Sequence, residues 1–80
     1  MRVTVKLYAT LRRYKPEIPS GAGLSLDVPS GTTVSQIVEQ LAIPDGVALV
    51  AMVNDKVQKL DYVLADGDTL SLFPPVAGGN

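Results

Sequence analysis

Eighty residues carrying a net charge of −1, with neither cysteine nor histidine, leave room for one small domain and few kinds of chemistry. The missing residue types exclude disulfides, thiolate nucleophiles, zinc–thiolate sites and the usual nucleophile and base pairs of enzymes. A chain this short buries only about 60% of the surface that its unfolded form exposes, so we expect no deep active site of its own.

The N-terminal stretch MRVTVKLYATL alternates polar and apolar residues, whereas a secretory signal contains a continuous apolar segment. The longest apolar run, VALVAMV at 47–53, is far shorter than the roughly 20 residues that a transmembrane helix needs. We therefore expect no membrane partner and a cytoplasmic location.

Two strands are predicted in the first third of the chain. VTVKLYA (3–9) and LSLDV (24–28) place an apolar residue at every second position, the pattern of a half-buried strand. Prolines and glycines make residues 10–23 a connecting loop, in which only a short turn around 11–14 is expected.

A helix is predicted to begin at Thr33, since Gln36 completes a T-x-x-Q capping box with it. Pro44 prevents the helix from continuing much further. Its apolar stripe, which is expected to pack on a sheet, consists of Val34, Ile37, Val38 and Leu41.

The second half of the chain reads as strands and turns. We predict a buried strand at 49–53, a turn at Asn54-Asp55 and a short partner strand at 56–58. A tight turn at Asp66-Gly67-Asp68 then leads to the last strand, TLSLF at 69–73. A calcium site at this turn is the weaker reading, because two carboxylates lack the other oxygen ligands.

The order of elements predicts an α+β domain in which one main helix packs on one face of a mixed sheet. By alternation, Tyr8 and Phe73 lie on the opposite face, where exposed aromatic residues favour a docking surface. The alternative is that they only cap neighbouring strands.

The basic stretch LRRYK at 11–15 has the composition of a nucleic-acid contact, but its positive charges are too few for that function. We interpret it as a solvated loop or the rim of a protein interface and expect no nucleic-acid partner.

The tail at 74–80 differs from the domain at 1–73. Pro74 and Pro75 cannot donate ladder hydrogen bonds, so the chain is expected to leave the sheet after Phe73 and reach at most roughly 25 Å. Gly78 and Gly79 lack Cβ atoms and can pass through a narrow channel. A frayed terminus is the alternative.

The motifs VPSGTTV, MVNDKV, LADGDTLSLF and PPVAGG resemble, over nearly the whole chain, the MoaD/ThiS family of ubiquitin-like sulfur carriers. PPVAGG is similar to the tail of molybdopterin synthase small subunits, the MoaD type. The resemblance implies the β-grasp, or ubiquitin-like, fold.

It also implies a function. An E1-like adenylating enzyme of the MoeB type would use ATP to activate the terminal glycine, and the resulting thiocarboxylate would donate sulfur to a pterin precursor for molybdenum cofactor biosynthesis. That step would occur in the large subunit of molybdopterin synthase, of the MoaE type. The chain would bind no cofactor and would not be catalytic alone.

By the same resemblance, Gly79 would carry the sulfur and Gly78 would give it passage. The expected partner-binding residues are Tyr8, Val57, Phe73, Pro74 and Pro75.

Asn80 departs from the pattern, because it locks the Gly79 carboxyl in a peptide bond. We hypothesise that a protease removes Asn80; the alternatives are a member of the family that lost the reaction and a partner that tolerates the extra residue. Rival functions are sulfur delivery to thiamine, cysteine or tRNA thiolation and a noncatalytic β-grasp binding module, including one that binds RNA.

Overall fold

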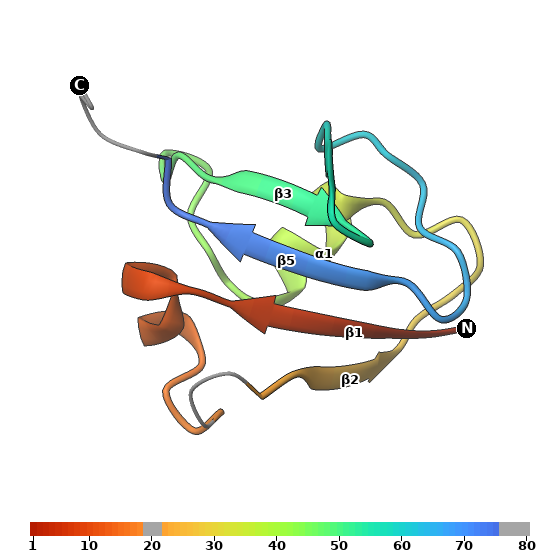
Figure 1. Cartoon of the computed structure of the whole chain (residues 1–80), viewed down its shortest axis with the longest axis horizontal. Coiled ribbons are helices and arrows are strands. Elements are labelled where there is room, and N and C mark those ends of the chain that lie inside the picture. The colour runs from red at the N-terminus through yellow and green to blue at the C-terminus, as the bar shows by residue number, and fades with distance from the viewer. Residues whose placement is uncertain (19–21, 76–80) are drawn as a thin grey trace.

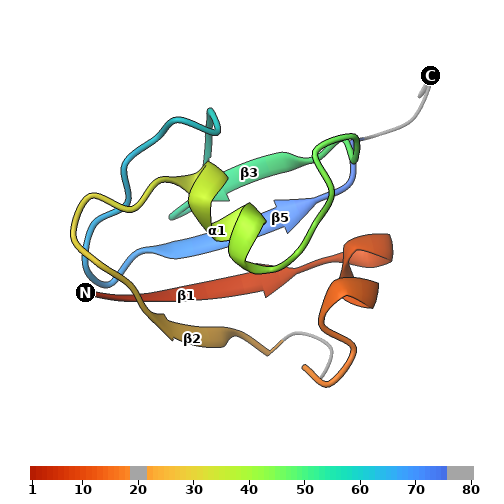
Figure 2. The same cartoon turned by 180° about the vertical axis from the view of Figure 1, so that it is seen from behind.

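The structure, a computed structural model, describes residues 1–18 and 22–75 and forms a mixed sheet with an α-helix across one face (Figures 1 and 2). In this part of the chain the elements are β1 (Arg2–Leu7), the 3-10 helix η1 (Ala9–Tyr14), β2 (Leu24–Asp27), α1 (Val34–Gln40), β3 (Val50–Val53), β4 (Lys56–Gln58) and β5 (Thr69–Phe73).

The strands lie in the order β2-β1-β5-β3-β4. β1 and β5 pair in parallel, whereas β1–β2, β3–β5 and β3–β4 pair antiparallel. The first and last strands are therefore central neighbours, and their C-terminal ends lie at the same end of the sheet (Figure 1). This arrangement confirms the predicted α+β class with a mixed sheet.

The core lies between the sheet and α1. In β1, Val3 and Val5 are each 1% exposed, and Val5 is the register partner of Leu70 on β5. Across from them, Val34 and Ile37 of α1 are fully buried. The period-two strand pattern and the helical stripe thus meet in one core, which also includes Leu7, Leu11, Val28, Leu41, Ile43, Ala51, Val53, Leu64 and Leu72.

The predicted capping box sets the start of α1. Thr33 Oγ1 accepts a hydrogen bond from the Gln36 N–H at 3.3 Å, and Gln36 Oε1 accepts one from the Thr33 N–H at 2.9 Å. The helix ends at Gln40, ahead of Pro44, and Ala42 adopts a left-handed conformation with φ of 62°. No helix in the described ranges has the length and hydropathy needed to cross a bilayer.

Two predicted turns have left-handed backbone. Asn54 and Asp55, with φ of 50° and 72°, make the two-residue connection of the β3–β4 hairpin, as the primed turns of such hairpins require. Gly67, with φ of 87°, occupies the turn before β5, and its N–H donates to the Arg2 carbonyl at 2.8 Å.

Several element boundaries differ from the sequence predictions, including the start of β1, which lies one residue earlier, at Arg2. β1 ends at Leu7 because Ala9, with φ of 52°, turns the chain into η1, which replaces the short turn expected near 11–14. Leu11 anchors η1 in the core at 2% exposure. β2 ends one residue early, at Asp27, and β3 begins one residue late, at Val50.

Candidate functional site

An aromatic pair marks the end of the sheet at which β5 terminates. Tyr8 and Phe73 stack with ring centroids 4.5 Å apart and planes 9° from parallel. The pair follows from the parallel β1–β5 register, because Leu7 is the partner of Leu72 and the Tyr8 N–H donates to the Leu72 carbonyl at 3.1 Å. Both rings lie on the face opposite α1, as the alternation predicted, and both are half-buried.

Apolar side chains continue this surface across the neighbouring strands. Val50 is the register partner of Phe73, and Met52 pairs with Ser71 on one side and with Val57 on the other. Val57 is 68% exposed. We define the apolar face patch as Tyr8, Val50, Met52, Val57 and Phe73.

The sequence analysis placed three of these residues and missed Val50 and Met52. The run at 49–53 was interpreted as a wholly buried strand, but only Ala51 and Val53 face the core at 3% exposure. Val50 and Met52 are half-buried on the other face. No alternation of polar and apolar residues marks the two outward positions, because every residue of 49–53 is apolar.

An open hollow of about 540 Å³ adjoins the patch along β4. Val50 and Val57 line it together with Leu49 and Leu60, and the exposed fraction of Leu60 is 47%. The hollow and the apolar face patch therefore adjoin at the β4 side of the sheet, on the face that α1 leaves uncovered and that is toward the viewer in Figure 1.

The chain leaves the sheet beside this patch. β5 ends at Phe73, and Pro74 and Pro75 follow outside any strand, half-buried and exposed respectively. Gly78 and Gly79, which were predicted to carry the chemistry, and Asn80 lie outside the described residues.

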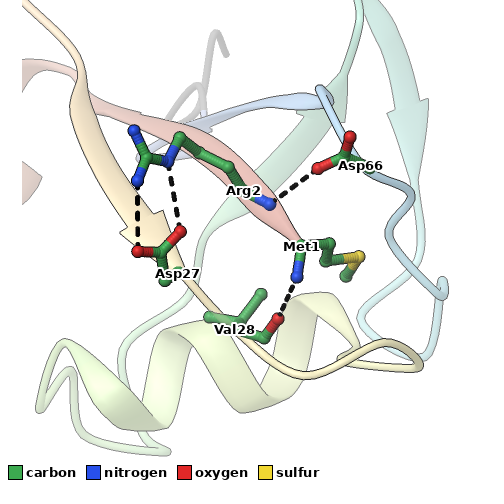
Figure 3. A network of polar contacts seen from close by, with 5 residues as sticks. All are labelled: Met1, Arg2, Asp27, Val28 and Asp66. Atoms are coloured by element: carbon green, nitrogen blue, oxygen red, sulfur yellow. Dashed lines mark hydrogen bonds and ion pairs between the residues drawn. The ribbon is translucent and has the colours of Figure 1, made fainter.

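The opposite end of the sheet holds a polar network (Figure 3). Arg2 donates to both Asp27 oxygens at 3.1 Å, and its backbone N–H donates to Asp66 Oδ1 at 2.8 Å. The N-terminal ammonium of Met1 donates to the Val28 carbonyl at 2.7 Å. The hydrogen bond and the positive charge of Arg2 lower the pKa of the Asp27 carboxyl from its ordinary value.

The acidic turn before β5 is used structurally. Asp68 is 7% exposed, and its carboxylate accepts hydrogen bonds from Asn54 Nδ2 at 2.8 Å and from the Ala65 N–H at 2.7 Å. Within residues 1–18 and 22–75, no three carboxylates gather into a group that could hold a metal ion. Asp66 and Asp68 instead fix the start of β5.

These features describe a small domain with an apolar patch on the uncovered face of its sheet and, in its described part, no group of residues that could hold a metal ion. The sequence model of the ThiS family matches residues 5–79. The chain belongs to this family. It therefore joins the MoaD/ThiS type of ubiquitin-like sulfur carriers, and the resemblance inferred from its motifs is confirmed.

Individual relatives agree with this assignment. A stretch of the ThiS-family chain is 49% identical over 39 residues to the molybdopterin synthase sulfur carrier subunit of Escherichia coli (strain K12). The match covers 49% of this chain and 47% of that protein, so the chain spans about half the length of the curated relative it matches.

Solved structures match the whole fold. The crystal structure of SAMP1 from Haloferax volcanii superimposes with a TM-score of 0.75 at 27% identity, covering 99% of this chain and 100% of that one. In the complex of subunits 1 and 2 of molybdopterin-converting factor from Helicobacter pylori 26695, one chain matches with a TM-score of 0.62 at 22% identity. That match covers 99% of this chain and 100% of the other. The predicted β-grasp fold is confirmed.

Proposed function

We propose that the chain is the sulfur carrier subunit of a molybdopterin synthase and that its reactive group is the carboxyl of Gly79. An E1-like adenylating enzyme of the MoeB type activates this carboxylate: an oxygen attacks the α-phosphorus of ATP, and pyrophosphate leaves. A hydrosulfide then attacks the acyl carbon, AMP leaves, and the product is a thiocarboxylate. The large subunit, of the MoaE type, uses this group to transfer sulfur to a pterin precursor in molybdenum cofactor biosynthesis.

One observation supports the proposal most directly: the last strand ends on the apolar face patch. Phe73 belongs to the patch, and Pro74 starts the tail at the next residue. A partner that covers Tyr8, Phe73 and Val57 is therefore placed beside the start of the tail, with Pro74 and Pro75 as the stiff connection. Docking and tail entry then occur in one binding event.

The choice of pathway rests on the relatives. The E. coli protein that shares 49% identity over 39 residues is named as the sulfur carrier subunit of molybdopterin synthase. The Helicobacter protein was solved in complex with the second subunit of its molybdopterin-converting factor. These names favour a large-subunit partner for this chain over thiamine, cysteine or tRNA thiolation.

Asn80 must be removed before the chain can act. Adenylation of Gly79 needs a free Gly79 carboxylate, and this carboxyl is in a peptide bond while Asn80 follows it. We infer that a protease trims the chain to the diglycine, so that the carrier is made as a precursor.

A second candidate function follows from the match to SAMP1, which is named a small archaeal modifier protein. The same activated Gly79 could be attacked by a lysine amine, with AMP leaving, to give an amide bond to a target protein. Thiocarboxylate formation and conjugation share the adenylation step and differ in the nucleophile.

The decisive experiment is the intact mass of the protein from its native host, before and after incubation with ATP, a sulfur source and the cognate adenylating enzyme. A variant ending at Gly79 serves as the matched control. Loss of asparagine followed by exchange of one oxygen for sulfur supports the proposal, and amide-linked adducts on other proteins support the modifier role. If the native protein keeps Asn80 and only the truncated variant is converted, the chain does not act as a carrier.

A further inference from the structure

The basic segment after β1 lies at the same end of the sheet as the start of the tail. η1 carries Arg12 and Arg13, with Lys15 directly after it, and it contacts β5. Because β1 and β5 run in parallel, η1 and Pro74 both follow their strands at this end, on the left in Figure 1 and on the right in Figure 2.

η1 is held in place by packing and not only by its own hydrogen bonds. Leu11 is 2% exposed within the core, and Tyr14 packs against that core. The Arg13 guanidinium carbon lies 5.5 Å from the centre of the Tyr14 ring, within range of a cation–π contact. Arg12 and Arg13 thus lie between a buried residue, Leu11, and a half-buried one, Tyr14, which hold η1 against the core.

The positive charges of this segment are not neutralised by neighbouring acids in the described part of the chain. There, the one ion pair joins Arg2 and Asp27, at the other end of the sheet. Arg12 and Arg13 are exposed. Glu17 is the single acid between residues 9 and 18, against three cations.

Charged groups lie at both ends of the sheet. Asp66 and Asp68 precede β5, and the Arg2 and Asn54 groups that they contact belong to the same far end. The far end also carries the cations Arg2 and Lys56, and the tail end carries the acids Glu17 and Asp45, so the segment after β1 is a local basic surface in a chain of net charge −1. Such a charge distribution orients a molecule as it approaches a charged partner.

A protein partner fits this surface better than a nucleic acid. Proteins that bind single-stranded nucleic acid offer exposed aromatic rings for base stacking. Here the Tyr14 ring is half-buried and has Arg13 over it, and Tyr8 stacks on Phe73. Neither ring presents two free faces.

We propose that Arg12, Arg13 and Lys15 form a steering surface for an acidic rim beside the tail channel of the adenylating enzyme. The inference rests on the proposed function and adds the chemistry of the partner surface. The encounter with the adenylating enzyme must form and dissociate in every cycle, and charge steering raises association rates without requiring a large apolar interface. The apolar face patch supplies contact area once the two proteins have met.

The test is the ionic-strength dependence of adenylation, measured as kcat/KM for the chain ending at Gly79 with ATP and the cognate adenylating enzyme. Arg12→Glu and Arg13→Glu are compared singly and together. Lys56→Glu is the matched control, because it changes the net charge as much as each single variant but lies next to the turn at the far end of the sheet. Circular dichroism and thermal midpoints establish that all variants are folded.

We expect kcat/KM of the parent chain to fall as salt is added, which charge steering requires. The double variant should lose about tenfold at low salt, within the range of steering effects, keep its kcat, and approach the parent at high salt. Lys56→Glu should stay within about twofold of the parent at every salt concentration, since its charge lies outside the steering surface.

Equal loss in Lys56→Glu and in the η1 variants would reduce the effect to net charge and overturn the inference. Unchanged kcat/KM in the double variant at low salt would overturn it as well. If the parent chain is not adenylated at all, the proposed function fails. If the parent chain is adenylated but the η1 variants behave like the controls, only the steering inference fails.

Discussion

Asn54 and Asp68 join the β3–β4 hairpin to the start of β5 through their side chains. Asn54 Nδ2 donates to Asp68 Oδ1 at 2.8 Å, while Asn54 Oδ1 accepts from the Thr69 N–H at 3.0 Å. The side-chain amide of Asn54 therefore bonds both to the Asp68 side chain, in the turn before β5, and to the backbone of Thr69, the first residue of β5.

Asp68→Ala should lower the free energy of unfolding by about 1–3 kcal/mol, because it leaves two donors, Asn54 Nδ2 and the Ala65 N–H, without their acceptor in a largely buried site. Urea denaturation measures the change. Asn54→Gly keeps the left-handed turn but removes the amide, so it should also destabilise, whereas Asp55→Gly should not. Equal effects at the two turn positions would assign the loss to the backbone instead.

Thr33→Ala should destabilise the domain by about 1 kcal/mol, the usual contribution of an N-cap side chain. Thr33→Ser retains the hydroxyl that accepts from the Gln36 N–H and should remain close to the parent. Thermal unfolding of both variants provides the comparison. A loss in Thr33→Ser as large as in Thr33→Ala would show that the methyl group, not the cap, carries the effect.

Gly23→Ala should be destabilising even though Gly23 is exposed, because a Cβ there would clash with Thr4 Cγ2. Thr4→Ser removes that methyl group, so the double variant should recover much of the lost stability in a double-mutant cycle. Gly46→Ala is the control, since nothing lies within 4 Å of its added Cβ. Additive losses for Gly23→Ala and Thr4→Ser would contradict the predicted clash.

The Asp27 carboxyl should titrate below its ordinary pKa in the folded chain and return toward the ordinary value in Arg2→Gln. Because the folded-state pKa is lowered, the stabilising contribution is present above the unfolded pKa of about 3.9 and is lost as the pH falls through the folded value. Carbon-detected NMR titration of the Asp27 carboxyl gives its pKa in the folded parent chain and in the folded Arg2→Gln variant. The stability effect should be small, because both side chains are exposed.

Phe73→Ala should weaken binding to the large subunit by at least about tenfold, as expected for an aromatic anchor at the centre of an interface. Loss of the ring also removes the stacking partner of Tyr8. Val63→Ala serves as a control, since Val63 is 55% exposed but lies outside the apolar face patch. Isothermal titration calorimetry measures the affinity of each variant for the large subunit. Equal affinities of Phe73→Ala and Val63→Ala would show that the docking surface does not include Phe73.

Local patterns in the sequence were sufficient for most elements. Alternation located β1, β2 and β5, and the Thr33–Gln36 pair located the start of α1, because each signal depends on residues a few positions apart. The 3-10 helix was underestimated, since its anchor is the insertion of the single side chain of Leu11 into a core built by distant segments. A mixed sheet was predicted, but the parallel β1–β5 pairing was not, because it joins the first and last strands of the chain.

The candidate site was predictable in the same uneven way. Parity placed Tyr8 and Phe73 on one face, but only the parallel register brings the rings into a stack. Val50 and Met52 were missed because a continuous apolar run conceals which residues face out. The Arg2 contacts to Asp27 and Asp66 span 25 and 64 positions, a separation on which local patterns carry no information.

The central position of β5 has a consequence for how the chain matures. The sheet is joined through its last strand, which lies between β1 and β3, so the ladder cannot close until the C-terminal residues have been synthesised. An incomplete or truncated chain lacks both the Tyr8–Phe73 stack and the route by which Pro74 leaves the domain. Because of this topology, the tail leaves the domain at the Tyr8–Phe73 stack only after the whole sheet has formed.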